Sequence, residues 1–229
     1  MGGRRRRTLL AMGVLVALLT LVLSACGGGG SAQDQAKAQK EQAKARPLPQ
    51  DPGALRPGEY RSEKFEPSLS LKVGKGWANS EQELPDFMQL ASQEQPGYLR
   101  FANIEEVYKP GTQDAVEAPE DLIGWLQNHP DLKTDEPEPI TVGGVEGVHI
   151  DVLVEDLPED VYGEYGVECV DIAPLSGGEQ GVYFREANKR RVIVLEDVKG
   201  ETVYIESANW DKVAPVAQKV VESVKWTGS

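Results

Sequence analysis

Residues 139–154 read PITVGGVEGVHIDVLV, and this stretch predicts the centre of the fold. The pair Gly143-Gly144 separates two runs rich in Val and Ile, which is the pattern of a β-hairpin with a two-residue turn. In the second run the side chains alternate between two faces, with Val148, Ile150, Val152 and Val154 on one and His149, Asp151 and Glu155 on the other. We therefore expect a half-buried strand whose polar face, with His149 and Asp151, is exposed to solvent.

Further strands and two helices are predicted on either side of this hairpin. Alternating or β-branched runs indicate strands over 69–73, 98–109, 182–185, 191–195 and 202–205. A helix is expected to begin at Ala118-Pro119-Glu120-Asp121 and to end before Pro130, because Pro and acidic residues suit a first helical turn. The fold class expected is therefore α+β, an antiparallel sheet flanked by helices.

The last helix carries the clearest periodicity in the chain. Its apolar residues follow the helical spacing of a stripe that faces a core, with Asp211 expected to cap the N-terminus. The residues of this stripe are Val213, Val216, Ala217, Val220, Val221 and Val224. We expect this helix to cover one face of the sheet.

The N-terminus has the layout of a bacterial export signal. Four arginines (Arg4 to Arg7) precede an apolar run over 9–23, which is shorter than the ~20 residues that span a bilayer. The run ends in Leu23-Ser24-Ala25-Cys26, which resembles the lipobox of bacterial lipoproteins. The resemblance implies cleavage of residues 1–25 as a signal peptide and attachment of diacylglycerol, with acyl chains such as palmitate, to Cys26. The alternative is an uncleaved membrane helix with an incidental cysteine.

A stalk is expected between this anchor and the folded domain. Gly27 to Gly30 form a flexible start, residues 31–46 are of low complexity, and four prolines follow between Pro47 and Pro57. The predicted organisation is a signal peptide over 1–25, a lipidated cysteine and disordered stalk over 26–58, and one domain over 59–229.

The charge balance excludes some partners. The chain holds 24 basic and 37 acidic residues, and loss of residues 1–25 removes four arginines and no acid, so the mature chain carries a net charge of −17. Binding to nucleic acid is not expected, because phosphate contacts need clustered Lys and Arg. Cys169 is the one cysteine besides Cys26, so no disulfide within the chain is expected, and Cys169 is expected to be buried.

The order of these elements resembles a known family. An N-terminal strand that ends in Gly76-Trp77, the stretch PEDLIGWLQNHPDL (119–132), the hairpin TVGGVEGVHIDV (141–152) and a closing helix followed by Val224-Lys225-Trp226 are similar to the PsbP-like fold. The chain looks most like the LpqN-like group of small exported actinobacterial lipoproteins. This resemblance covers about residues 59–227 and implies a fold, with no active site to carry over.

Two groups of residues are candidates for function. His149 and Asp151 could act as a base and its orienting acid or as two metal ligands, although we expect a surface pair. The longest loop of the domain is rich in acids and tyrosines but lacks the spacing of a calcium loop, and we expect it to be a contact surface. Its candidate residues are Glu155, Asp156, Glu159, Asp160, Tyr162 and Tyr165.

These observations predict a lipid-anchored protein on the outer face of the cell membrane. We expect a non-enzymatic binding or accessory module of the cell envelope, with no cofactor and no metal, whose partner is an envelope protein or a ligand. One alternative is an envelope hydrolase or metal-dependent enzyme that uses His149, Asp151 and the acidic loop. Another is a small-ligand carrier, which would need a cavity of ~300 Å³ or more between the sheet and a helix.

Overall fold

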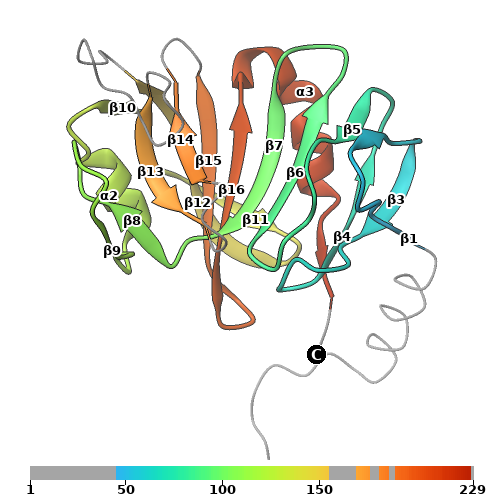
Figure 1. Ribbon diagram of the computed structural model, residues 1–229, viewed down its shortest axis with the longest axis horizontal. Coiled ribbons are helices and arrows are strands. Elements are labelled where there is room, and N and C mark those ends of the chain that lie inside the picture. Colours follow the sequence, from blue (N-terminus) through green and yellow to red (C-terminus); the bar gives the residue numbers. More distant parts are fainter. Residues whose placement is uncertain (1–44, 155–168, 176–180, 186–188, 228–229) are drawn as a thin grey trace, which may run out of the picture.

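The structure, a computed structural model, describes residues 45–154, 169–175, 181–185 and 189–227 (Figure 1). In this part of the chain one large sheet dominates, and all of its strand pairs are antiparallel. Its strands in order are β10 (Leu132–Thr134), β12 (Val145–Val154), β15 (Arg190–Val198), β16 (Glu201–Ala208), β7 (Tyr98–Asn103), β6 (Phe87–Ser92), β5 (Trp77–Asn79) and β2 (Gly53–Ala54), and β11 (Glu138–Val142) also pairs with β12.

The predicted hairpin is confirmed as β11 and β12. Gly143 and Gly144 both have positive φ, 60° and 86°, which suits the type of two-residue turn that matches the twist of the flanking strands. The pairing brings Val142 opposite Val145 and Glu138 opposite His149. Expected strands 182–185, 191–195 and 202–205 correspond to β14 (Gly181–Phe184), β15 and β16.

Each face of the large sheet is covered by different elements. One face packs against α3 (Trp210–Glu222) and a small sheet of β1 (Arg46–Pro47), β3 (Gly58–Arg61), β4 (Leu69–Val73) and β17 (Lys225–Trp226). The other is covered by α2 (Leu122–Gln127), the pair β13 (Val170–Pro174) with β14, and β8 (Glu106–Tyr108), which pairs with β9 (Ala115–Glu117). Figure 1 shows β13 and β14 on the side of the sheet opposite to α3. The described chain is mostly sheet with two α-helices, so the antiparallel sheet is confirmed and the helical part is smaller than an α+β expectation suggests.

The closing helix follows the predicted stripe with two corrections. Val213, Ala217, Val220 and Val221 are buried in the helix, whereas Val216 is 40% exposed. At about 100° per residue, Val216 lies roughly 80° from the centre of the stripe, at its margin. The helix begins at Trp210 after Asn209, which has φ 55° and no side-chain cap bond, so Asp211 lies inside the first turn and does not cap the helix.

The folded domain begins earlier than the predicted boundary at residue 59. Strand β1 pairs in parallel with β3, and Leu48 and Leu55 are 2% and 6% exposed within the core. The guanidinium group of Arg46 lies 4.4 Å from the ring centre of Tyr60 and donates to the carbonyls of Arg56 and Pro57. Residues 45–58 therefore belong to the domain and not to the stalk.

Several predictions fall outside the described residues. These are the signal peptide, Cys26, the stalk up to residue 44 and the acidic contact loop with Glu155, Asp156, Glu159, Asp160, Tyr162 and Tyr165. Among the residues that are described, no helix is long and apolar enough to cross a membrane. Cys169 is described and is buried as expected, at 1% exposure.

Candidate functional site

A cavity of about 280 Å³ lies between α3 and the sheet. Its floor is formed by strands β12, β15, β16 and β7, its roof by α3, and one wall by β11. The residues that line it are Leu99, Ile140, Thr141, His149, Arg191, Ile193, Ile205, Ser207, Trp210, Gln218, Val221 and Glu222. This volume is close to the lower end of the ~300–1,000 Å³ that is typical of small-molecule sites.

Strand register explains why these side chains meet. In one row across the sheet Asp151 pairs with Arg191, Arg191 with Ser207 and Ser207 with Leu99. In the next row on the same face, His149 pairs with Ile193 and Ile193 with Ile205. Because side chains alternate along a strand, both rows point toward α3. The face therefore presents a polar row beside an apolar one.

The expectation that His149 and Asp151 are exposed to solvent is wrong. Their side chains are only 13% and 8% exposed, because the end of α3 and the strand β11 cover that face. Asp151 accepts two hydrogen bonds from Arg191, to Nε at 2.6 Å and Nη2 at 3.0 Å, and lies 2.9 Å from Nζ of Lys189. Burial opposes ionisation, yet these hydrogen bonds lower the pKa of Asp151 below its ordinary value. Asp151 is thus engaged with two cations and does not orient His149.

Arg191 is held on its other side by an aromatic ring. Its guanidinium carbon lies 4.3 Å from the ring centre of Trp210, the first residue of α3. A guanidinium at this distance makes a cation–π contact. Trp210 and Asp151 together fix Arg191 at the edge of the cavity with its charge compensated.

His149 contacts a different carboxylate. Its Nε2 lies 3.5 Å from a carboxylate oxygen of Glu138 on β11, whereas its Nδ1 is buried and has no hydrogen-bond partner among the described residues. Burial and the nearby Arg191 lower the pKa of His149, despite Glu138 and Asp151. A neutral imidazole carries one ring proton, and on Nε2 that proton would point toward Glu138.

Ser207 supplies a second unpaired polar atom. The residue is 3% exposed, and its Oγ has no hydrogen-bond partner in the described part of the chain. A buried polar group without a partner costs about 1–3 kcal/mol, so such groups in proteins usually meet a water or a ligand. Two buried atoms without a partner, His149 Nδ1 and Ser207 Oγ, therefore belong to residues around a cavity whose lining is half apolar and half polar.

Catalytic arrangements are not formed by the described residues. No hydrogen bond joins His149 to Ser207 there, and no group of three His, Cys, Asp or Glu side chains in those ranges is placed to hold a metal. Analysis of the sequence identified His149 as a candidate site residue but did not identify Arg191, Ser207 or Trp210. The alternation of polar and apolar residues along β15 and β16 was the available signal, and it identifies a cavity only once the position of α3 is known.

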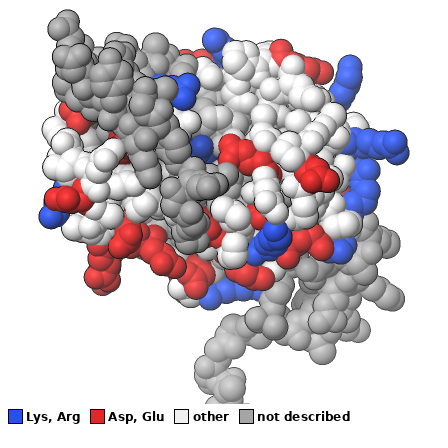
Figure 2. Space-filling model, in the orientation of Figure 1, with Lys and Arg blue, Asp and Glu red and all other residues white. Residues whose placement is uncertain are grey.

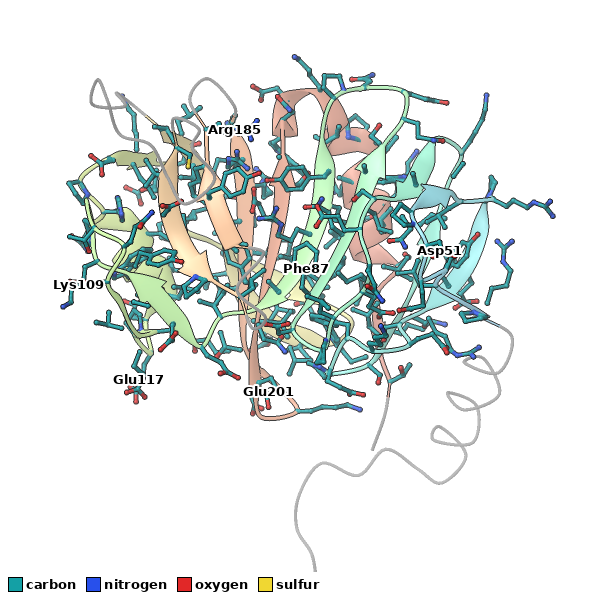
Figure 3. The ribbon with its side chains drawn as sticks, viewed as in Figure 1. Asp51, Phe87, Lys109, Glu117, Arg185 and Glu201 are labelled. Atoms are coloured by element: carbon teal, nitrogen blue, oxygen red, sulfur yellow. The ribbon has the colours of Figure 1, made fainter. Side chains whose placement is uncertain are left out.

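A second polar cluster lies on the opposite face of the sheet. Glu206, which is fully buried, accepts from Tyr98 Oη at 2.8 Å and contacts Nη1 of both Arg190 and Arg100. Arg100 also lies over the ring of Phe87, which Figure 3 labels on β6. Burial, with the adjacent Glu206 carboxylate, raises the pKa of Tyr98 to about 12. This cluster ties β6, β7, β15 and β16 together.

The surface carries charges of both signs on the face shown in Figure 2. On the face in view in Figure 2, the Lys and Arg side chains of the described residues are scattered among Asp and Glu. They form no continuous basic surface in this view for a phosphate backbone.

Comparisons with known proteins find similarity among solved structures. No family model matches the chain, and no curated protein matches it. Among solved structures it is similar to the solution structure of cyanobacterial PsbP (CyanoP) from Synechocystis sp. PCC 6803. That similarity has a TM-score of 0.36 and 11% sequence identity, and it covers 76% of this chain and 96% of that chain. A similarity of this extent carries no argument about ligand or partner, and the LpqN-like assignment stays a prediction.

Proposed function

We propose that this chain is an extracytoplasmic lipoprotein of the PsbP-like, LpqN-like type, and that its domain is a non-enzymatic binding module of the cell envelope. In this proposal, lipid on Cys26 holds the protein to the outer face of the cell membrane. The cavity beneath α3 is the binding site. The observation that carries the binding role is the cavity itself, of about 280 Å³ between α3 and the sheet, whose lining residues are half apolar and half polar.

The anchoring part of the proposal rests on the sequence at the N-terminus. The Leu23-Ser24-Ala25-Cys26 motif follows an arginine-rich start and an apolar run, and four glycines follow it. Two acyl chains give stable attachment, at ~0.8 kcal/mol for each buried CH₂ group. We therefore expect Cys26→Ser to abolish membrane retention while the domain keeps its fold. A Cys26→Ser protein that stays in the membrane fraction through a high-salt wash would contradict lipid anchoring.

The binding part is tested by filling the cavity. Ser207→Leu places three more carbons in the cavity and removes the unpaired hydroxyl, whereas Ser207→Ala removes the hydroxyl and leaves the space open. The mature Cys26→Ser chain, with either substitution or neither, is incubated with an envelope extract and weighed by native mass spectrometry. We expect a bound small molecule on the parent and on Ser207→Ala, and none on Ser207→Leu. Equal capture by all three proteins, or capture by none, would contradict a ligand site in this cavity.

The Ser207→Leu protein should remain folded, which makes the comparison interpretable. Loss of an unpaired hydroxyl and burial of added methyl groups both favour the folded state, so its free energy of unfolding should stay within about 1 kcal/mol of the parent or exceed it. Urea unfolding of the three proteins provides this control.

A further inference from the structure

Charge is divided unevenly over the described part of the domain. Residues 45–76 and 210–227, which include the small sheet, β2 and α3, hold nine basic and six acidic residues, a net charge of +3. The remaining described residues hold eight basic and 21 acidic residues, a net charge of −13. Figure 1 shows β1, β3 and β4 together at one side of the molecule, so the charge difference is also a difference in space.

We infer that the domain docks on the anionic phospholipid headgroups of the membrane through the outer surface of α3 and the small sheet. This surface, the basic face, is defined by the exposed residues Lys72, Lys212, Lys219 and Lys225. The inference rests on the proposed function, because lipid on Cys26 is what brings the domain to a membrane. Its basis is the geometry of the four lysines, their ion pairs and the position at which the chain enters the domain.

The helix α3 provides one half of the basic face. Lys212 and Lys219 are seven residues apart, which places them about 20° apart around the helix axis. Val216 lies between them in sequence and is 40% exposed. Long basic side chains beside an exposed apolar one suit the headgroup region, because their charged ends reach phosphate while their stems cover apolar surface.

The small sheet provides the other half. Ser223, directly after α3, accepts through Oγ from the backbone N–H of Lys72 at 2.8 Å, so the end of the helix lies against β4. Strand register places Lys225 opposite Ser70 and Glu59 opposite Lys72. Because Ser70 and Lys72 are two residues apart on one strand, their side chains share one side of the small sheet, whereas the alternate residues of β4 pack into the core. The basic face is therefore continuous from α3 to β4 and β17.

The acidic residues near the basic face leave most of its charge in place. Glu59 lies 4.0 Å from Lys225 Nζ, and its side chain is 24% exposed. By contrast, Lys72, Lys212 and Lys219 form no ion pair with another described residue. Three exposed ammonium groups thus remain uncompensated on this surface.

The proposed anchor joins the domain on the same side. Nineteen residues, 26–44, lie between the start of the mature chain and Ala45, where the described domain begins. The carbonyl of Ala45 accepts from Arg61 Nη1 at 2.7 Å, so the chain enters the domain at the small sheet. Nineteen residues span at most about 65 Å, and a short flexible connection gives an effective concentration on the order of mM. Weak docking is therefore sufficient once the chain is anchored.

The acidic part of the domain favours the same orientation. A basic residue close to an anionic membrane contributes about 1 kcal/mol, or fivefold in the partition coefficient. Charges more than about 8 Å from the surface are largely screened at physiological ionic strength, so acids on the far part of the domain do not cancel this attraction. The same acids would be repelled if that part were turned toward the membrane.

Paramagnetic broadening of amide signals measures the docking surface. The ¹⁵N-labelled mature Cys26→Ser chain is mixed at low salt with nanodiscs that contain a nitroxide-labelled lipid, in phosphatidylcholine alone or with anionic phosphatidylglycerol. In the anionic discs we expect the strongest broadening at the amides of Lys72, Val216 and Lys219, and none on α2 or β9. Phosphatidylcholine discs, or physiological salt, should remove the effect. This chain carries no lipid, so a negative result would overturn the docking inference and leave the proposed anchor at Cys26 untouched.

A matched pair of double variants tests the basic face itself. Lys72→Gln with Lys219→Gln removes two charges from it, whereas Lys109→Gln with Lys199→Gln removes two exposed charges from the acidic part of the domain. We expect the first pair to weaken the apparent Kd for anionic discs about tenfold or more and the second pair to change it less than twofold. Thermal melts should show both proteins folded, since all four side chains are exposed. Equal losses in the two variants, equal binding to both kinds of disc, or strongest broadening on α2 or β9 would overturn the inference.

Discussion

Arg191 and Asp151 face each other across β15 and β12 and are joined by two hydrogen bonds, of 2.6 and 3.0 Å. Each partner has a further contact, because Arg191 lies against Trp210 and Asp151 lies 2.9 Å from Lys189. This arrangement connects the sheet to the first turn of α3 and compensates the only positive charge among the residues that line the cavity. It therefore helps to hold α3 on the sheet and leaves Arg191 with its charge compensated.

Asp151→Asn should lower the stability of the domain. The variant leaves Arg191 and Lys189 without their carboxylate, and because both are partly exposed we expect a loss of about 1–3 kcal/mol in the free energy of unfolding. Urea unfolding measures this loss. Lys189→Met is the control and should cost less, since Arg191 keeps its partner; a larger loss in that variant would contradict the role given to Arg191.

A decrease in pH should lower the free energy of unfolding through the protonation of His149. Its folded pKa lies below the ordinary value of about 6.5, so the unfolded chain binds the proton more readily between those two pKa values. Stability relative to His149→Phe should therefore be full above pH 7 and fall as the pH decreases through 6.5 toward the folded pKa. His129, whose pKa burial also lowers against the effect of Asp131, is present in both proteins and cancels. Urea unfolding of the two proteins between pH 7.5 and 5 measures the difference, and a difference that grows in favour of the parent at low pH would contradict it.

The buried cluster around Glu206 should matter more for stability than for binding. Glu206→Gln leaves Arg100 and Arg190 buried without a compensating carboxylate, for which we expect a loss of about 3–5 kcal/mol. Glu196→Gln, on the exposed part of β15, should change stability by less than about 0.5 kcal/mol. Chemical denaturation compares the pair. Equal effects of the two substitutions would show that the cluster is not a stabilising contact.

Local patterns in the sequence predict much of the fold. The two-residue turn at 143–144 requires positive φ at both positions, which a glycine pair adopts without strain, and this turn gives the hairpin and its register. The spacing of valines gives the buried face of α3, apart from Val216 at the margin of the stripe. Both features depend on residues close together in the chain, which is why sequence alone contains them.

The site depends on contacts between distant segments and could not be predicted in the same way. Alternation places His149 and Asp151 on one face of β12, but only the position of α3 and β11 shows that this face is covered. Arg191 takes Asp151 as its partner from a strand 40 residues away in sequence. The packing of residues 45–58 could not be predicted from the sequence for the same reason. Leu48 and Leu55 lie among prolines that suggest a stalk until their tertiary partners are known.

The dependence of ligand capture on the free space beneath α3 is the most direct test of the account. The mature Cys26→Ser chain and its Ser207→Leu and Ser207→Ala variants are incubated with the same envelope extract and weighed by native mass spectrometry. The account predicts a bound small molecule on the parent and on Ser207→Ala and none on Ser207→Leu, because only the leucine fills space in the cavity of about 280 Å³. Equal capture by all three proteins, or capture by none, would contradict the claim that this cavity is a ligand site.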